Sequence, residues 1–360
     1  MMQYLQSGDW VQEWSAAAGF MGALLTALLI VKTQRWHGAL SYDQTNGVQK
    51  FHEEPTPRVG GLAIFLGTAL SLWGAERTQA ELVQTILLAG APAFAMGLAE
   101  DLSKRIGVWP RLWATMVSGG VAIAITGYIL TRVDVAFMDA LLATPWIAVV
   151  FTVFAVGGVA NAVNIIDGFN GLSISTVFFA LLSYAWMAAQ LGDWTLCNTA
   201  ISLAAVALGL LVVNWPLGKI FLGDGGAYFL GFALSWMAVL LIARNPEVST
   251  FAVLLVCAYP VTESLFSVYR RIQAGRSPGH PDRLHFHSLV KRRLVNVMFR
   301  HQSMTWRNSL TGLIVGSITL ITGCVAGLTY LHHGWSVLAL TAAVLGYVVL
   351  YRGLIHYRRH

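Results

Sequence analysis

Asparagine and aspartate side chains cluster where one apolar stretch of the chain ends and the next begins. The segment reads Asn161-Ala-Val-Asn164-Ile-Ile-Asp167-Gly-Phe-Asn170-Gly-Leu. Asn161 and Asn164 lie three residues apart, so on a helix they share a face, whereas Asp167-Gly and Asn170-Gly favour turns. A polar break between two helices needs fewer such side chains, so we interpret this segment as part of a ligand site.

A second motif, Phe221-Leu-Gly-Asp224-Gly-Gly, precedes another apolar stretch. Its glycines let a phosphate or a metal approach the backbone, and the start of the following helix offers amide donors to an anion. The Asp224 carboxylate is a hard oxygen ligand of the kind that Mg²⁺ prefers. The motif indicates a magnesium or phosphate site, although taken alone it also fits a plain turn.

Adjacent carboxylates, Glu100 and Asp101, follow a further apolar stretch. On a helix they point in different directions, but both can reach a substrate that a metal holds. Lys104 lies one turn after Asp101 and can meet a phosphate. A solvated charge cluster is the alternative explanation.

Basic and histidine residues mark two long loops. The first contains Lys50 and His52 and ends in Thr-Pro-Arg58-Val-Gly-Gly, where the proline interrupts regular structure and the glycine pair permits close helix packing. The second contains Pro-Asp282-Arg283-Leu-His285-Phe-His287. Its two histidines share a face only in an extended segment, and with Arg283 they form a cationic group suited to a diphosphate. Zinc is disfavoured there, because no cysteine or third well-spaced ligand accompanies them.

The stretches that position these motifs predict an all-α polytopic membrane protein, a single domain over 1–360. Of the 360 residues, 56% are hydrophobic and 11% are charged, against about 25% charged in soluble domains. A membrane span needs about 20 apolar residues. The gaps between charge clusters predict eleven transmembrane helices, near 15–32, 59–75, 81–99, 112–130, 145–163, 172–190, 197–215, 226–243, 250–268, 308–331 and 335–351.

Lysine and arginine are distributed unevenly between the two sets of connecting loops. One set holds only Arg77, Arg132 and Arg244, and the other holds the remaining 20 of the 23 basic residues. The excess of basic residues in cytoplasmic loops then predicts an amino terminus outside and a carboxyl terminus in the cytoplasm. Topology explains the net charge of +6, so nucleic acid is not predicted as a partner.

On this topology, five carboxylates lie at the cytoplasmic ends of the spans: Glu100, Asp101, Asp167, Asp224 and Asp282. Ionisable groups at membrane depth are costly, so those that flank spans are functional candidates. Their gathering on one face predicts a reaction centre that opens to the cytoplasm. The loops expected to build it cover about 33–58, 100–111, 164–171, 216–226 and 269–307.

In chain order, TPRxGG, the acidic pair with its lysine, NAxNxxDGxxGL, FLGDxG and PDRxHxH resemble the polyprenyl-phosphate N-acetylhexosamine-1-phosphate transferase family. The resemblance extends from about Asp43 to His287, and the last motif is more similar to the UDP-N-acetylglucosamine branch than to the muramoyl-pentapeptide branch. It implies an enzyme that moves a sugar-1-phosphate from a UDP-sugar to undecaprenyl phosphate and releases UMP. The implied cofactor is Mg²⁺, with Mn²⁺ as an alternative. The implied place is a bacterial inner membrane, with the active site facing the cytoplasm, where the reaction initiates a cell-envelope glycan. The resemblance leaves open which sugar is moved and whether the protein forms a homodimer.

The resemblance also implies a role for each motif residue. The implied metal ligands are Asp224, Asp101 and Asp167. The implied catalytic residues are these three with Glu100, Lys104, His285 and His287. The implied substrate-binding residues are Asn161, Asn164, Asn170, Asn214, Phe221, Asp282, Arg283, Lys50, His52 and Arg58. Among these, Phe221 and Asn214 would hold the uracil.

Four positions depart from the family pattern. Glu100 and Glu263 stand where Asp is more usual, Asn170 stands where the bacterial enzymes usually carry Asp, and Ser288 replaces a His. The charge is kept at two of these and lost at Asn170. We interpret the departures as a divergent sugar specificity.

A membrane transporter of nucleotide-sugars or lipid-linked intermediates is the main alternative function. Transporters place coupling residues near the midplane in broken helices, often in repeated halves. Apart from Glu263, the predicted spans lack such residues, and the sequence shows no duplication. A CDP-alcohol phosphatidyltransferase is disfavoured, because Asp167-Gly168 is not followed by the Ala-Arg of that motif.

Overall fold

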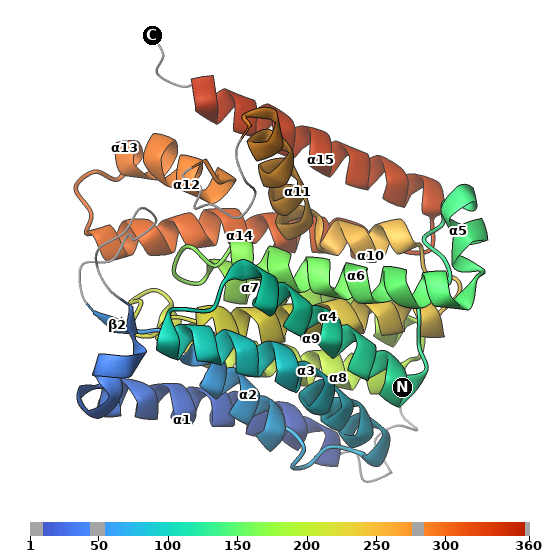
Figure 1. Ribbon diagram of the computed structural model, residues 1–360, viewed down its shortest axis with the longest axis horizontal. Coiled ribbons are helices and arrows are strands. Elements are labelled where there is room, and N and C mark those ends of the chain that lie inside the picture. The colour runs from blue at the N-terminus through green and yellow to red at the C-terminus, as the bar shows by residue number, and fades with distance from the viewer. Residues whose placement is uncertain (1–9, 44–54, 276–283, 357–360) are drawn as a thin grey trace.

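The computed structural model describes residues 10–43, 55–275 and 284–356, and this part of the chain is almost entirely helical (Figure 1). A two-residue antiparallel pairing, Tyr42 with Pro57 and Asp43 with Thr56, ties the end of the first helix to the segment before the second. The elements in chain order are α1 (Trp10–Ser41), β1 (Tyr42–Asp43), β2 (Thr56–Pro57), α2 (Gly60–Leu70), α3 (Arg77–Ser103), α4 (Val108–Thr126), α5 (Ala136–Leu142), α6 (Pro145–Ile165), α7 (Leu172–Gln190), α8 (Trp194–Asn214), α9 (Gly223–Arg244), α10 (Thr250–Val256), α11 (Ala258–Gln273), α12 (Phe286–Val290), the π-helical turn η2 (Lys291–Val295), α13 (Asn296–Met298), α14 (Met304–Thr329) and α15 (His333–His356).

Among the described residues, nine helices are long and apolar enough to cross a membrane, and the bent pair α10–α11 adds a tenth if counted as one span. The fold is therefore that of a polytopic all-α membrane protein, as predicted. The predicted count of eleven is not confirmed. The predicted and observed numbers differ because of the expected spans 59–75 and 250–268. A stretch without charges shows neither how long the helix within it is nor whether that helix bends.

The first difference is one of length. Helix α2 has 11 residues, which rise about 16 Å, whereas the hydrocarbon core of a bilayer is about 30 Å thick. The second difference is a bend of 80° between α10 and α11. Pro260 has no N–H to donate to the carbonyl four residues earlier, and that residue, Val256, is where α10 ends. The proline explains the break.

Helix α9 forms the centre of the bundle. In Figure 1 α1 runs along one edge and α15 along the other, with α8 and α9 between them. Nearly every residue of α9 is buried, and the helix packs on α3 and α6. Gly231 permits the contact with α6, because a Cβ there would lie 2.7 Å from the Cα of Ala160.

The bundle has two ends. We call the site end the one at which α3, α6 and α8 finish and α9 begins, on the left of Figure 1. At least half of the surface of several tryptophans is exposed near the helix ends. Near the site end these include Trp36, Trp109 and Trp306, and near the opposite end they include Trp73, Trp146, Trp194 and Trp335. Tryptophan is enriched at both membrane–water interfaces, so the two groups indicate the levels at which a bilayer surrounds the bundle.

Candidate functional site

Glycines from two sequence motifs pack together at the start of α9. The N–H groups of Gly60 and Gly61 donate to the carbonyls of Phe221 and Leu222 at 2.9 and 2.8 Å. A Cβ on Gly61 would lie 2.3 Å from the nitrogen of Gly226, closer than any side chain permits. The close packing predicted for the glycine pair is therefore present, and it joins the Thr-Pro-Arg-Val-Gly-Gly motif to the start of α9.

Asp101, at the end of α3, caps the first turn of α9. Its Oδ1 accepts from the N–H of Asp224 at 2.8 Å and its Oδ2 from the N–H of Gly225 at 2.9 Å. The side chain is fully buried, and the Nε of Arg58 lies 3.4 Å from Oδ1. A carboxylate at a helix N-terminus satisfies amides that have no partner inside the helix. Asp101 thus holds the backbone from which the Asp224 side chain projects.

Asp224 receives cations and an amide from three other elements. Arg58, which precedes α2, donates to Oδ1, and Arg111, from the first turn of α4, donates to Oδ2. The Nδ2 of Asn164, near the end of α6, donates to Oδ1 at 3.2 Å. The side chain of Asp224 is only 4% exposed. Segments far apart in the sequence therefore meet at a single buried carboxylate.

The sequence analysis did not select Arg111. Its guanidinium contacts Asp224 and lies 6.0 Å from the centre of the Tyr228 ring. Cations are unfavourable in the first turn of a helix, because the helix dipole is positive there. An arginine in the first turn of α4 was therefore a signal that an anion lies opposite.

Asp167 lies in the turn between α6 and α7 and faces the same group of charges. Burial raises the pKa of its carboxyl to about 7; the charge of Asp224 acts in the same direction and that of Arg58 opposes it. The carboxyl groups of Asp101, Asp167 and Asp224 thus gather around Arg58 at one end of the bundle.

The residues around Asp224 fit a Mg²⁺ ion that substrate oxygens complete. Within the described ranges, no group of three or more His, Cys, Asp and Glu side chains could hold a metal ion by itself. Mg²⁺ is commonly bound by one or two carboxylates together with phosphates and waters, and Asp224 and Asp167 supply two carboxylates. The two guanidinium groups that contact Asp224 show that this carboxylate accommodates positive charge.

Three predicted residues lie beside this cluster rather than in contact with Asp224. Glu100 accepts from the N–H of Ile106 at 2.6 Å, and its charge acts on Arg111. The exposed Lys104 donates to the carbonyl of Tyr42. The Nδ2 of Asn161 donates to the hydroxyl of Thr115 in α4 and to the carbonyl of Gly157 in its own helix. Their predicted contacts with substrate stay predictions.

The predicted uracil-binding and loop residues make structural contacts. Asn214 is buried, accepts from the N–H of Gly171 at 2.5 Å and donates to the carbonyl of Ile220 at 2.6 Å. Asn170 is also buried and donates to Ser309 at 3.1 Å. The hydrogen bonds of Asn170 and Asn214 fix the loops on either side of the site. Phe221 is half-buried, and its contact with uracil stays a prediction.

His285 and His287 lie next to the loop that carries Asp167. Both are buried, and their rings stack with centroids 5.2 Å apart and planes 10° apart. The sequence predicted that the two histidines share a face only in an extended segment, and this was wrong. His285 is extended but His287 lies inside α12, and the two rings still stack. The ring of His287 meets Phe169 edge to face at 5.6 Å. The predicted residues Lys50, His52, Asp282 and Arg283 lie outside the described residues.

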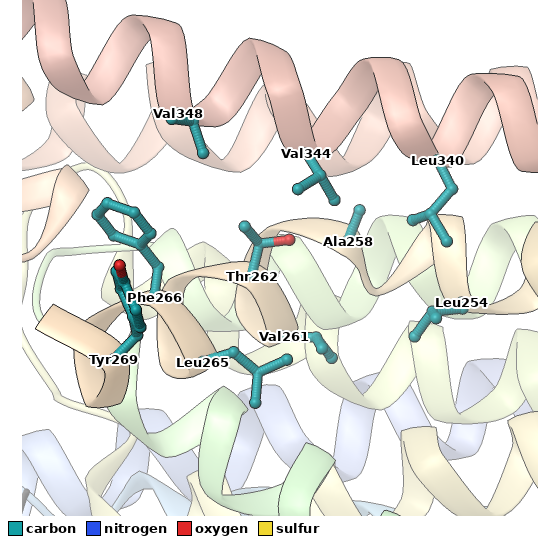
Figure 2. Close-up of a pocket in the computed structure, with 10 residues that line it drawn as sticks. All are labelled: Leu254, Ala258, Val261, Thr262, Leu265, Phe266, Tyr269, Leu340, Val344 and Val348. Carbon is teal, nitrogen blue, oxygen red and sulfur yellow. The ribbon is translucent and has the colours of Figure 1, made fainter. Parts of the chain in front are cut away.

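An apolar pocket of about 340 Å³ lies between the bent pair α10–α11 and α15 (Figure 2). Its walls are almost entirely hydrocarbon, so it suits an apolar chain. The lining residues are Leu254, Ala258, Val261, Thr262, Leu265, Phe266, Tyr269, Leu340, Val344 and Val348.

The chain is similar in sequence to known proteins. Residues 83–242 match the model of glycosyl transferase family 4, and this span contains Asp101, Arg111, Asn164, Asp167 and Asp224. Over 277 residues, 74% of this chain and 75% of the relative, the chain is 29% identical to a probable undecaprenyl-phosphate N-acetylglucosaminyl 1-phosphate transferase of Bacillus subtilis (strain 168).

Two other relatives cover about the same share. The chain is 27% identical to the undecaprenyl-phosphate α-N-acetylglucosaminyl 1-phosphate transferase of Yersinia pestis, over 68% of each chain. It is 28% identical to the decaprenyl-phosphate N-acetylglucosaminephosphotransferase of Mycolicibacterium smegmatis, over 69% of this chain and 68% of the relative. The protein is thus a polytopic membrane protein, and its residues 83–242 resemble glycosyl transferase family 4. The predicted resemblance is confirmed by this match and by the similarity to the three transferases.

Proposed function

We propose that this protein transfers a sugar-1-phosphate, with an N-acetylhexosamine as the expected sugar, from a UDP-sugar to undecaprenyl phosphate. The observation that carries the proposal is the meeting of Arg58, Arg111 and Asn164 at Asp224, within the region that matches the family. The names of the relatives support a polyprenyl-phosphate acceptor and an N-acetylglucosamine phosphate group.

In this reaction, an oxygen of the lipid phosphate attacks the phosphorus that bears the sugar. The bond from that phosphorus to the bridging oxygen breaks, and UMP leaves with the bridging oxygen. Phosphoryl transfer depends mainly on positioning and on charge neutralisation. Two anionic substrates repel each other, and Arg58 and Arg111 supply positive charge where they would meet. A phosphate monoester, with a second pKa of about 6, is largely ionised at neutral pH, so the attacking oxygen needs no general base.

Asp224, Asp167 and the side-chain oxygen of Asn164 are the groups that would hold Mg²⁺ in this proposal. When bound, the ion would neutralise charge on the phosphates of the donor. Asp101 would keep Asp224 in place through the two amide hydrogen bonds at the start of α9.

The location of the cluster suits a lipid acceptor. The tail of undecaprenyl phosphate lies in hydrocarbon and its phosphate at the interface, so the chemistry must occur at the end of a span rather than at the midplane. The apolar pocket beside α11 (Figure 2) is a place where part of the polyprenyl chain can lie. Transporters also contain broken helices such as α10–α11. Here, however, the Glu263 carboxylate next to the break already accepts hydrogen bonds from His285, Phe286 and Tyr347 of the same chain, whereas a transporter would use such a group to bind a coupling ion.

We also propose that the site end faces the cytoplasm of a bacterial inner membrane and that the amino terminus lies outside. The uneven distribution of lysine and arginine supports this orientation. A reporter fused after His360 should behave as cytoplasmic, and a periplasmic signal from it would contradict the orientation.

A donor screen tests the proposed reaction directly. The purified protein in lipid nanodiscs would be given undecaprenyl phosphate, Mg²⁺ and a panel of UDP-sugars, and UMP release would be measured. We expect release with at least one UDP-N-acetylhexosamine and only when the lipid phosphate is present. Absence of release with every donor, from protein that is shown to be folded, would reject the proposal.

A further inference from the structure

Helix α11 contacts both histidines of the His285–His287 segment through side chains one turn apart. The Glu263 carboxylate oxygen Oε1 lies 2.9 Å from the Nδ1 of His285. The hydroxyl of Tyr259 lies 3.1 Å from the Nδ1 of His287. Residues four apart on a helix are neighbours on one face, so this spacing matches two stacked rings. Each ring is held by its Nδ1 edge against α11.

The Glu263 carboxylate is fully buried and is surrounded by three donors. Besides His285, the N–H of Phe286 donates to Oε2 at 3.0 Å, and the hydroxyl of Tyr347 donates to the same oxygen at 3.0 Å. Tyr347 belongs to α15, the last helix of the chain. Because an ionised carboxylate only accepts hydrogen bonds, the Nδ1 of His285 must carry the proton of their shared bond.

The orientation of the two rings follows from these contacts. The planes differ by only 10°, and both Nδ1 atoms face α11, so the Nε2 atoms lie along the other edge of the stack. For His287 this edge meets the turn that carries Asp167, because a Cβ on Gly168 would lie 3.1 Å from its Nε2. The Nε2 of His285 is therefore directed to the same side, towards the site.

We propose that Glu263, supported by Tyr347 of α15, is a positioning residue for His285 and that it directs the Nε2 of this ring to the UDP-sugar donor. This inference rests on the proposed function. It adds that Glu263 affects the use of the UDP-sugar and not the use of the lipid phosphate. The partner of one ring nitrogen sets the tautomer and the orientation of an imidazole. At metal sites, loss of the outer partner that orients a histidine commonly costs about 10- to 100-fold in activity, and we expect a loss of the same size here.

The variant Glu263→Gln makes a sharp prediction about protons. Two donors, the Phe286 N–H and the Tyr347 hydroxyl, converge on Oε2, so the amide oxygen of glutamine takes that place. Its NH₂ group then faces the Nδ1 of His285 and turns that nitrogen into an acceptor. Glu263→Asp keeps the negative charge, and Tyr347→Phe keeps the carboxylate but removes one donor.

Tyr184→Phe is the matched control for the loss of a buried hydroxyl. Tyr184 is fully buried in the core, where its hydroxyl donates to the carbonyl of Val253 at 3.1 Å and lies 3.3 Å from the Sγ of Cys257. The four variants would be measured in nanodiscs for melting temperature and for the KM and kcat of UMP release, with each substrate varied in turn. The ring nitrogens of ¹⁵N-histidine would be observed by NMR, with the His285 signal assigned by its loss in His285→Gln.

We expect Glu263→Gln to lower kcat/KM for the UDP-sugar about 10- to 100-fold and to leave KM for undecaprenyl phosphate unchanged. The NMR signal should show a protonated Nδ1 on His285 in the wild type and an unprotonated one in Glu263→Gln. Glu263→Asp should recover most of the activity, Tyr347→Phe should lose less than Glu263→Gln, and Tyr184→Phe should match the wild type.

Three results would overturn the inference while the proposed function stands. The first is that Glu263→Gln is as active as an active wild type, and the second is that the Nδ1 signal of His285 is unchanged in that variant. The third is a loss of kcat/KM that is equal for both substrates and follows the fall in melting temperature, as a merely structural role would produce. A folded wild type that releases no UMP with any donor would instead reject the proposed function, and the donor-directed role of His285 with it.

Discussion

Ion pairs lie at both ends of the helix bundle, but they are built differently. At the opposite end, Arg132 donates to Asp134 at 2.6 Å and also to the backbone carbonyls of Asn245 and Val248 at 3.2 and 2.8 Å. Asp134 in turn accepts from the N–H of Thr250 at 2.7 Å. These contacts fasten the loop after α4 to the turn before α10.

At the site end, the donors converge on one side chain instead of on the backbone. Arg58, Arg111 and Asn164 all donate to the carboxylate of Asp224, and Arg58 remains 30% exposed. Side chains can exchange one anion for another more readily than a helix end can release its carbonyls. The comparison teaches that the cluster at the opposite end joins backbone segments, whereas the cluster at Asp224 joins side chains, as the proposed binding of phosphate groups and a metal requires.

The largest expected effect comes from Asp224→Asn. Removal of the charge on which the site converges should lower UMP release by about 10³-fold, while Asp101 still caps α9 and the protein folds. Asp134→Asn, the same change at the opposite end, should leave kcat/KM within about twofold. Both would be assayed in nanodiscs together with their melting temperatures, and substantial turnover by Asp224→Asn would remove that residue from the proposed metal site.

Removal of divalent cations should have a comparably large effect on activity. EDTA should abolish UMP release, and added Mg²⁺ or Mn²⁺ should restore it, because Arg58 and Arg111 alone do not neutralise the substrate phosphates together with the carboxylates of the site. The Arg132–Asp134 cluster needs no metal, so the chelator should change the melting temperature little. Turnover that persists in EDTA would contradict the role of the metal.

Arg111→Ala should have an intermediate effect. Loss of one of the two guanidinium groups on Asp224 should lower kcat/KM by about 10- to 100-fold, a loss of about 1.4–2.8 kcal/mol in transition-state stabilisation. The matched change Arg132→Ala should leave kcat/KM nearly unchanged and instead lower the free energy of unfolding by about 2–3 kcal/mol, because buried carbonyls lose their donor. If both variants showed the same pattern, the two ends would not differ in function.

The smallest expected effect is on stability in acid. Burial alone raises the pKa of Asp134, but the Thr250 N–H and Arg132 outweigh it and hold that pKa below the ordinary value of 3.8. The stabilisation is therefore present above pH 3.8 and is lost as the pH falls through the lower pKa of the folded state. Asp134→Asn should reduce stability by about 1 kcal/mol at neutral pH.

Melting curves between pH 3 and 7 would measure this effect. The difference in melting temperature between the wild type and Asp134→Asn should narrow as the pH falls below 3.8. A constant difference over the whole range would show that the Asp134 charge does not contribute in the way described.

Sequence reasoning reached the motifs of the site because they are local. Asp224 between glycines and the Asn164–Asp167 pair could be selected from residue type and spacing alone. It did not reach Arg111, a single arginine outside any motif, whose partner lies 113 residues further along the chain. Pairings of this range depend on how α4 packs beside α3 and α9, which local patterns do not contain.

The sequence by itself determined that the chain is a polytopic membrane protein with acidic motifs at one set of helix ends. The length of an apolar stretch and the number of charges in each loop are properties of the chain itself, so they can be counted without a structure. Only the tertiary structure decided that Asp101 caps α9, that Arg111 meets Asp224, and that Glu263, which also accepts from Tyr347, holds His285. Those outcomes depend on which buried groups find partners, and a buried polar group is satisfied only by the helices that pack against it.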